Sequence, residues 1–166
     1  EILSFCRLQG VHTAVETTGC GSWDSLYEIC RKTDLIYYDI KLLDSELHRK
    51  FTGMSNDVIL RNLRRLSENR EAVGEIVVRI PCIPGINDHK EQIEQTARFV
   101  SELKLSFLEL LPYNEAAGAK YMWLFQDYSL QKLHTRKKEY YEELQKYVSQ
   151  FGLLPYGVGH GRRKEK

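Results

Sequence analysis

Four short apolar stretches of this sequence end in side chains that could bind a ligand. These side chains are Glu16 and Thr17, Asp39 and Lys41, Arg79, and Tyr113 and Asn114. Two carboxylates with a threonine hydroxyl suit an ammonium group or a small cation, through charge-assisted hydrogen bonds. A lysine and an arginine nearby suit a carboxylate or a phosphate. A ligand that carries both kinds of group, such as an amino acid, would fit the whole set.

The stretch from Asp34 to Asp44 shows how such groups would be presented. Its pattern is typical of one β-strand, in which successive side chains point to opposite faces. One face is apolar and the other is polar at its end, the members being Ile36, Tyr38, Ile40 and Leu42 against Tyr37, Asp39 and Lys41. The apolar face predicts packing under helices, and the other face predicts a polar environment. A structural ion pair on an edge strand is the alternative interpretation of this stretch.

The remaining elements alternate between strands and helices. We expect further strands over residues 11–17, 75–83 and 105–111, the third strand ending near Pro81, which has no N–H to donate. Helices are expected over residues 1–9, 22–32, 44–51, 55–69, 87–104 and 136–151. Ser22 is the predicted N-cap of one helix, and Asn87 or Asp88 that of another.

This order of elements predicts an α/β fold of four parallel β-α units with right-handed crossovers. Ligands bind at the carboxyl ends of parallel strands, where the polar residues named first would therefore converge. Each also has a structural explanation. Arg79, for example, could pair with Glu75 or Glu109, and Asn114 is a common turn former.

Two segments near the C-terminus carry many aromatic residues. Residues 114–133 show no clear periodicity but include Tyr121, Trp123, Phe125 and Tyr128. This composition is unusual for a solvated linker and favours a packed loop or a partner surface. In the helix that follows, we expect the residues on the packed side to be Tyr140, Leu144, Tyr147 and Phe151.

Composition excludes several classes of function. With 166 residues and a net charge of +1, the chain offers no bulk electrostatic attraction for nucleic acid or an anionic membrane. No apolar run approaches the ~20 residues of a membrane helix, and no signal peptide is visible, so we expect a cytoplasmic protein. The four cysteines and five histidines lack the close spacing of metal sites, so no metal ligands are predicted.

Five motifs, taken together, resemble the C-terminal part of the glycyl-radical-enzyme activating enzymes, such as the pyruvate formate-lyase activating enzyme. The motifs are HTAVETTG (12–19), DLIYYDIKLLD (34–44), TGMSN (52–56), VVRIPCIPGINDH (77–89) and LELLPYN (108–114). They stand in the family's order and spacing over nearly all of residues 10–150. The resemblance implies part of a radical S-adenosylmethionine partial (β/α)6 barrel over residues 1–151, followed by a tail over 152–166 with a disordered end.

The same resemblance implies a function. The family binds S-adenosylmethionine and a [4Fe–4S] cluster, takes an electron from a donor such as flavodoxin or ferredoxin, and makes a 5′-deoxyadenosyl radical. That radical removes a hydrogen from a backbone glycine of the partner glycyl radical enzyme. The cluster motif CxxxCxxC is absent here and Glu1 is not a start methionine. We therefore expect a piece of a longer enzyme, inactive alone, with the cluster cysteines outside this chain.

Residue roles follow from the matched motifs. S-adenosylmethionine would be held by Glu16, Thr17, Asp39, Lys41 and Asn114. A monovalent cation would be held by Glu16, Thr17, Asp39 and the Tyr37 carbonyl, and the substrate peptide would approach Arg79 and Tyr113. Members often have histidine where this chain has Asn114, and some have aspartate where it has Glu16.

Two other functions compete with this one. Lys41 could be the nucleophile of a Schiff-base lyase, although the neighbouring Asp39 would raise the lysine pKa rather than lower it. A non-catalytic partner-binding domain, using the aromatic segment from Tyr121 to Tyr128, is the third possibility.

Overall fold

The structure, a computed structural model, describes residues 1–156 apart from 126, 129 and 131. Within these residues four strands form one sheet in the order β1-β2-β3-β4, and every neighbouring pair is parallel. The strands are β1 (Ala14–Thr17), β2 (Leu35–Asp39), β3 (Glu75–Pro81) and β4 (Phe107–Leu111). The predicted α/β class with four parallel strands is confirmed, and so is the place of Pro81 at a strand end.

All four strands are shorter than predicted. β1 begins at Ala14 rather than Val11, because the backbone N–H and the hydroxyl of Thr13 donate to Asp34 Oδ2 at 2.7 and 2.9 Å. β2 ends at Asp39, and the residues up to Asp44 form a loop rather than the predicted strand end. In that loop, the side-chain amide of Asn87 donates to the Lys41 carbonyl, and that of Asn56 donates to the Leu42 and Leu43 carbonyls.

Helices fill the connections between the strands. They are α1 (Ile2–Leu8), α2 (Trp23–Cys30), α3 (Ser45–Thr52), α4 (Asp57–Glu68), α5 (Lys90–Glu102), η1 (Glu115–Ala117, a 3-10 helix), α6 (Gly118–Trp123) and α7 (Lys138–Ser149). Ser22 is confirmed as the N-cap of α2, accepting from the Ser25 N–H. The predicted cap of α5 is wrong. His89 occupies that position, because Asn87 and Asp88 use their side chains in contacts with other segments.

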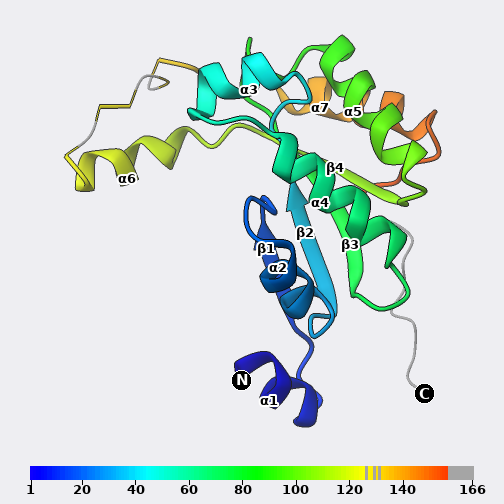
Figure 1. Cartoon of the computed structure of the whole chain (residues 1–166). Helices are drawn as coiled ribbons and strands as arrows, with labels where there is room; N and C mark the ends of the chain where they lie inside the picture. The colour runs from blue at the N-terminus through cyan, green and yellow to red at the C-terminus, as the bar shows by residue number, and fades with distance from the viewer. Residues whose placement is uncertain (126, 129, 131, 157–166) are drawn as a thin grey trace.

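The main core lies between one face of the sheet and the helices. Ile36 and Tyr38 are fully buried, and Ile40 and Leu42 are 1% and 5% exposed, which confirms the predicted apolar face. They belong to a core that α2, α4, α5 and α7 also contribute to, and Figure 1 shows α2 and α4 crossing in front of the strands. Burial of this face fixes which side chains point to the opposite one.

A smaller apolar cluster lies on the opposite face of the sheet. It consists of Leu35, Val77 and Phe107, with Tyr37 and Tyr156 packed against them. The chain returns to this face after α7, where the Leu154 N–H donates to the Ser106 carbonyl at 2.9 Å and Leu154 pairs in parallel with Phe107. The disordered end predicted for the tail, GRRKEK (161–166), lies outside the described residues. The division of the chain at residue 151 stays a prediction.

The aromatic segment is partly helical and mostly exposed. Figure 1 shows α6 extending away from the sheet, and Trp123 and Phe125 are 76% and 100% exposed. Only Tyr121 and Tyr128 of the four predicted aromatics pack together, with ring centroids 4.6 Å apart. The packed-loop interpretation is therefore wrong for Trp123 and Phe125.

The packed side of α7 includes most of the predicted residues, since Leu144 is buried and Tyr140 and Phe151 pack against the core. Tyr141, Leu144 and Val148 are buried in it, whereas Tyr147 lies at the margin and donates to Glu94. None of the helices in the described part of the chain has the length and hydropathy needed to cross a membrane.

Candidate functional site

Three charged side chains from three strands meet on the face of the sheet opposite the main core. Arg79 Nη1 and Nη2 donate to Glu16 Oε1 and Oε2, each at 3.0 Å, and Arg79 Nε donates to Asp39 Oδ1 at 2.9 Å. The strand register places Asp39 opposite Arg79, and Glu16 one strand further away. This charged triad (Glu16, Asp39 and Arg79) brings together three of the predicted site residues.

Burial and charge make the triad an electrostatic centre. Arg79 is only 8% exposed and lies over the Tyr37 ring, 4.7 Å from its centroid. The hydrogen bonds to Glu16 raise the pKa of Arg79, and the guanidinium in turn lowers the pKa of the Glu16 carboxyl, again chiefly through the hydrogen bonds. Two carboxylates against one guanidinium leave an excess negative charge, which favours a nearby ammonium group or metal cation.

Glu109 is a member of this row of residues that the sequence analysis did not assign to the site. It stands opposite Arg79 in the pairing of β3 with β4, yet Arg79 pairs with Glu16 and Asp39 instead. Burial raises the pKa of the Glu109 carboxyl, and a hydrogen bond from the Tyr156 backbone and the charge of Arg79 only partly oppose this. In the sequence, Glu109 alternates with Leu108 and Leu110 and so lies on the opposite face of the strand from both. This alternation is the signal that could have assigned Glu109 to the polar face.

A cavity of about 680 Å³ opens beyond the carboxyl ends of β2, β3 and β4. We call it the strand-end cavity, and its lining includes Lys41, Tyr113 and Asn114, together with Ile83, Asn87 and Leu111. The volume falls in the range of small-molecule sites. Lys41, Tyr113 and Asn114 are thus brought together as predicted, but the residues of the charged triad do not line this cavity.

Local hydrogen bonds engage several of the predicted residues in holding their own loops. Thr17 Oγ1 accepts from the Gly19 N–H at 2.9 Å, and Asn114 Oδ1 accepts from the Ala116 N–H at 3.0 Å. The Tyr113 hydroxyl donates to the Leu130 carbonyl at 3.1 Å and shares a hydrogen bond of 2.7 Å with the Tyr128 hydroxyl. The bonds of Tyr113 and Asn114 fix the loop that lines the strand-end cavity, and the bond of Thr17 fixes the turn after β1.

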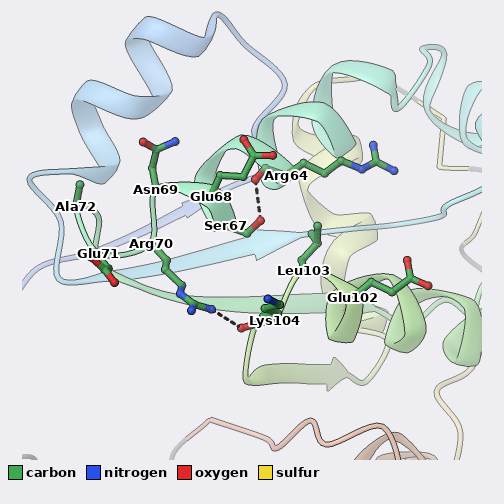
Figure 2. Close-up of a pocket in the computed structure, with 10 residues that line it drawn as sticks. All are labelled: Arg64, Ser67, Glu68, Asn69, Arg70, Glu71, Ala72, Glu102, Leu103 and Lys104. Carbon is green, nitrogen blue, oxygen red and sulfur yellow. Dashed lines mark hydrogen bonds between the residues drawn. The ribbon is translucent and has the colours of Figure 1, made fainter.

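A second cavity, of about 700 Å³, lies at the opposite end of the sheet (Figure 2). Its lining comes from the segments that precede β3 and β4, and Arg70 Nη1 donates there to the Lys104 carbonyl at 3.2 Å. None of the predicted site residues lines it, and its charges are mixed, with Arg64, Arg70 and Lys104 near Glu68, Glu71 and Glu102. The candidate site is therefore the carboxyl end of the sheet.

The thiols of the described residues do not fit an iron–sulfur cluster. No three His, Cys, Asp or Glu side chains within residues 1–156, the undescribed positions aside, are placed to hold a metal ion. Burial raises the pKa of Cys30 to about 11 and that of Cys82 to about 12, and both side chains lie in the core. Thiols in such apolar surroundings are poor metal ligands.

Comparison with known proteins identifies relatives over most of the chain. The trans-4-hydroxy-L-proline dehydratase activating enzyme of Clostridioides difficile is 33% identical over 147 residues, covering 87% of this chain and 48% of the relative. The isethionate sulfite-lyase activating enzyme of Oleidesulfovibrio alaskensis is 42% identical over 123 residues, covering 74% of this chain and 39% of the relative. The chain thus spans about half the length, or less, of these relatives. No family model matches it.

Solved structures give the same result for the fold. A domain of the pyruvate-formate lyase-activating enzyme from Bacteroides vulgatus matches with a TM-score of 0.73 and 29% identity, covering 93% of this chain and 85% of that domain. A radical SAM methyltransferase from Sphaerobacter thermophilus matches with a TM-score of 0.61 at 14% identity, which shows a shared fold alone. By sequence and by fold, the chain therefore belongs with the activating enzymes of glycyl radical enzymes and has part of the radical S-adenosylmethionine barrel.

Proposed function

We propose that this chain is the part of a glycyl-radical-enzyme activating enzyme that binds the amino-acid end of S-adenosylmethionine. The observation that carries the proposal is the strand-end cavity, which Lys41, Tyr113 and Asn114 line next to strands that end in the charged triad. The activity of the relatives, each named as an activating enzyme, supports the same conclusion.

Each part of the site has a proposed role. The Lys41 ammonium attracts the carboxylate of the ligand, and Asn114 lines the same cavity. Glu16 and Asp39, with the Thr17 hydroxyl and the Tyr37 carbonyl, hold the ligand ammonium and a monovalent cation. Their excess negative charge favours both.

Arg79 and Tyr113 are proposed to lie near the substrate peptide. Arg79 also has a role that its contacts support directly, since it keeps the Glu16 and Asp39 carboxylates apart from each other and in fixed positions. Tyr113 lines the strand-end cavity, where the hydroxyl is held by Tyr128 and Leu130.

When bound, S-adenosylmethionine together with a [4Fe–4S] cluster would supply the radical chemistry, and the residues named above would hold the amino-acid end of the cofactor. Cysteines outside this chain are proposed to hold that cluster, since the thiols described here do not fit it. The partner is a glycyl radical enzyme, and the electron donor is a protein such as flavodoxin or ferredoxin.

Binding measurements on charge variants test this function. In a complete enzyme carrying this sequence, Lys41→Ala and Asp39→Ala should each remove about 1.5–3 kcal/mol of binding free energy. That corresponds to roughly 10- to 150-fold weaker binding of S-adenosylmethionine in calorimetry. Lys146→Ala, an exposed lysine on α7, serves as the control and should bind as wild type. Wild-type affinity in both test variants would overturn the assignment.

A further inference from the structure

Lys41 stands on a loop whose shape no regular secondary structure determines. β2 ends at Asp39 and α3 begins at Ser45, so the lysine lies between them. A lysine side chain has many rotamers, so the position of its backbone decides which points its ammonium group can reach. A binding lysine on such a loop needs another group to hold it.

The group that holds the Lys41 backbone is the side chain of Asn87. Asn87 Nδ2 donates to the Lys41 carbonyl at 2.7 Å and to the Pro81 carbonyl at 2.9 Å. Asn87 Oδ1 accepts from the Ile83 N–H at 2.5 Å. Both amide hydrogens and the amide oxygen are therefore used, and Asn87 is only 2% exposed. One buried side chain thus joins the β2–α3 loop to the end of β3.

Asn87 is itself held by the residue that follows it. Asp88, which is fully buried, accepts from the Gly85 N–H at 2.7 Å and from Arg136 Nε at 2.9 Å. The Tyr140 hydroxyl donates to the Asp88 carbonyl at 2.8 Å. The turn that carries Asn87 is thereby fixed to the segment around the start of α7, and it can act as a rigid support.

We propose that Asn87 is a positioning residue for ligand binding, which fixes the backbone of Lys41 so that its ammonium reaches the carboxylate of an amino-acid ligand in the strand-end cavity. The inference rests on the proposed function. A positioning role differs from a general structural role in one respect. If Asn87 is a positioning residue, its substitution weakens ligand binding only when the Lys41 side chain is present. Both residues line the same cavity, so the support and the binding group are adjacent.

The sharpest single change is Asn87→Asp in a complete enzyme. Aspartate has the same shape, but its carboxylate presents an oxygen, in place of the donating nitrogen, to the Lys41 and Pro81 carbonyls. We expect the affinity for S-adenosylmethionine to fall about tenfold, the size typical of coupling between residues in contact. Gln145→Glu makes the same chemical change at an amide that donates to the Leu108 carbonyl at 3.0 Å, away from the cavity, and should keep wild-type affinity.

A double variant separates positioning from general damage. If Asn87 acts through Lys41, Asn87→Asp should weaken binding in the wild type and have almost no further effect in Lys41→Ala. An equal loss in both backgrounds, or no loss in the wild type, would overturn the inference. Should Asn87→Asp fail to fold, as judged by near-UV circular dichroism, the smaller Asn87→Ser is measured in the same two backgrounds. Wild-type affinity in the single variants Lys41→Ala and Asp39→Ala would instead refute the proposed function.

Discussion

Arg79 on β3 reaches across β2 to form a two-point ion pair with Glu16 on β1. Both bonds measure 3.0 Å, and the Tyr37 ring of the intervening strand lies beneath the guanidinium at 4.7 Å. β1 is an edge strand whose only strand partner among the described elements is β2. The ion pair therefore ties the edge strand to the third strand as well as shaping the site.

Loss of the arginine should destabilise the protein. Arg79→Met leaves Glu16 and Asp39 facing each other without the charge between them. Removing one partner of a buried ion pair costs ~3–5 kcal/mol, and we expect about 2–3 kcal/mol here, because the Glu16 side chain is 68% exposed. Urea denaturation checks the value. Adding Glu16→Gln to Arg79→Met should restore part of the loss, and a double variant less stable than the single one would contradict this explanation.

Ionisation of Glu109 should lower the stability of the folded protein as the pH rises. Because burial raises its pKa above the ordinary 4.5, the native state binds its proton more tightly than the unfolded state does. The contribution of Glu109 to stability is complete below the unfolded pKa and is lost as the pH rises through the folded pKa. Glu109→Gln, which stays neutral, should therefore be more stable than wild type at pH about 7 and equal to it near pH about 4. Denaturation curves across this range test the sign, and a variant less stable at neutral pH would refute it.

The turn after β1 should tolerate a methyl group at Gly21 and not at Gly19. Gly19 has φ of +66°, and a Cβ there would lie 1.7 Å from the hydroxyl oxygen of Tyr38, which donates to the Ile59 carbonyl at 2.7 Å. Gly19→Ala should cost more than about 2 kcal/mol, since the left-handed backbone alone costs about 1–2 kcal/mol. Gly21→Ala meets nothing within 4 Å and should stay within about 0.5 kcal/mol of wild type in thermal unfolding. Equal losses of stability in the two variants would contradict both the backbone strain and the close contact with Tyr38 at Gly19.

The exposed aromatic residues Trp123 and Phe125, at the end of α6 and just after it, should contribute to binding of the partner protein and not to binding of the cofactor. Replacing Trp123 and Phe125 by serine removes apolar surface from the segment that continues from the cavity wall at Tyr121. We expect binding of the glycyl radical enzyme to weaken at least about tenfold, as for aromatic hot spots, with unchanged affinity for S-adenosylmethionine. Ile29→Ser, at an exposed apolar residue of α2, is the control. Unchanged partner binding in a pull-down titration would exclude this segment.

The sequence predicted the parts of the fold that local patterns determine. Alternation in the stretch around Tyr38 predicted its buried face, and the Ser22 cap followed from its place before an apolar helix face. Strand order predicted that polar residues would gather at one end of the sheet, where Glu16, Asp39 and Arg79 do meet.

What the sequence could not predict depends on partners that are distant along the chain. Glu16 and Arg79 are 63 residues apart, so their pairing needed the strand register. Asn87 is of a residue type that often caps helices, but its side-chain amide bonds to the backbone of Lys41, Pro81 and Ile83. His89 therefore occupies the N-cap position of α5. Competition between local and long-range hydrogen bonds carries no sequence signature.

The apolar cluster on the face of the charged triad bears on the direction from which a ligand would approach. Tyr156 packs edge-on against Tyr37 and Phe107, with ring centroids 6.3 and 5.2 Å apart, and covers the amino half of this face together with Leu35 and Val77. These apolar side chains occupy the amino half of the face, so a ligand of the charged triad would approach it from the carboxyl ends of the strands.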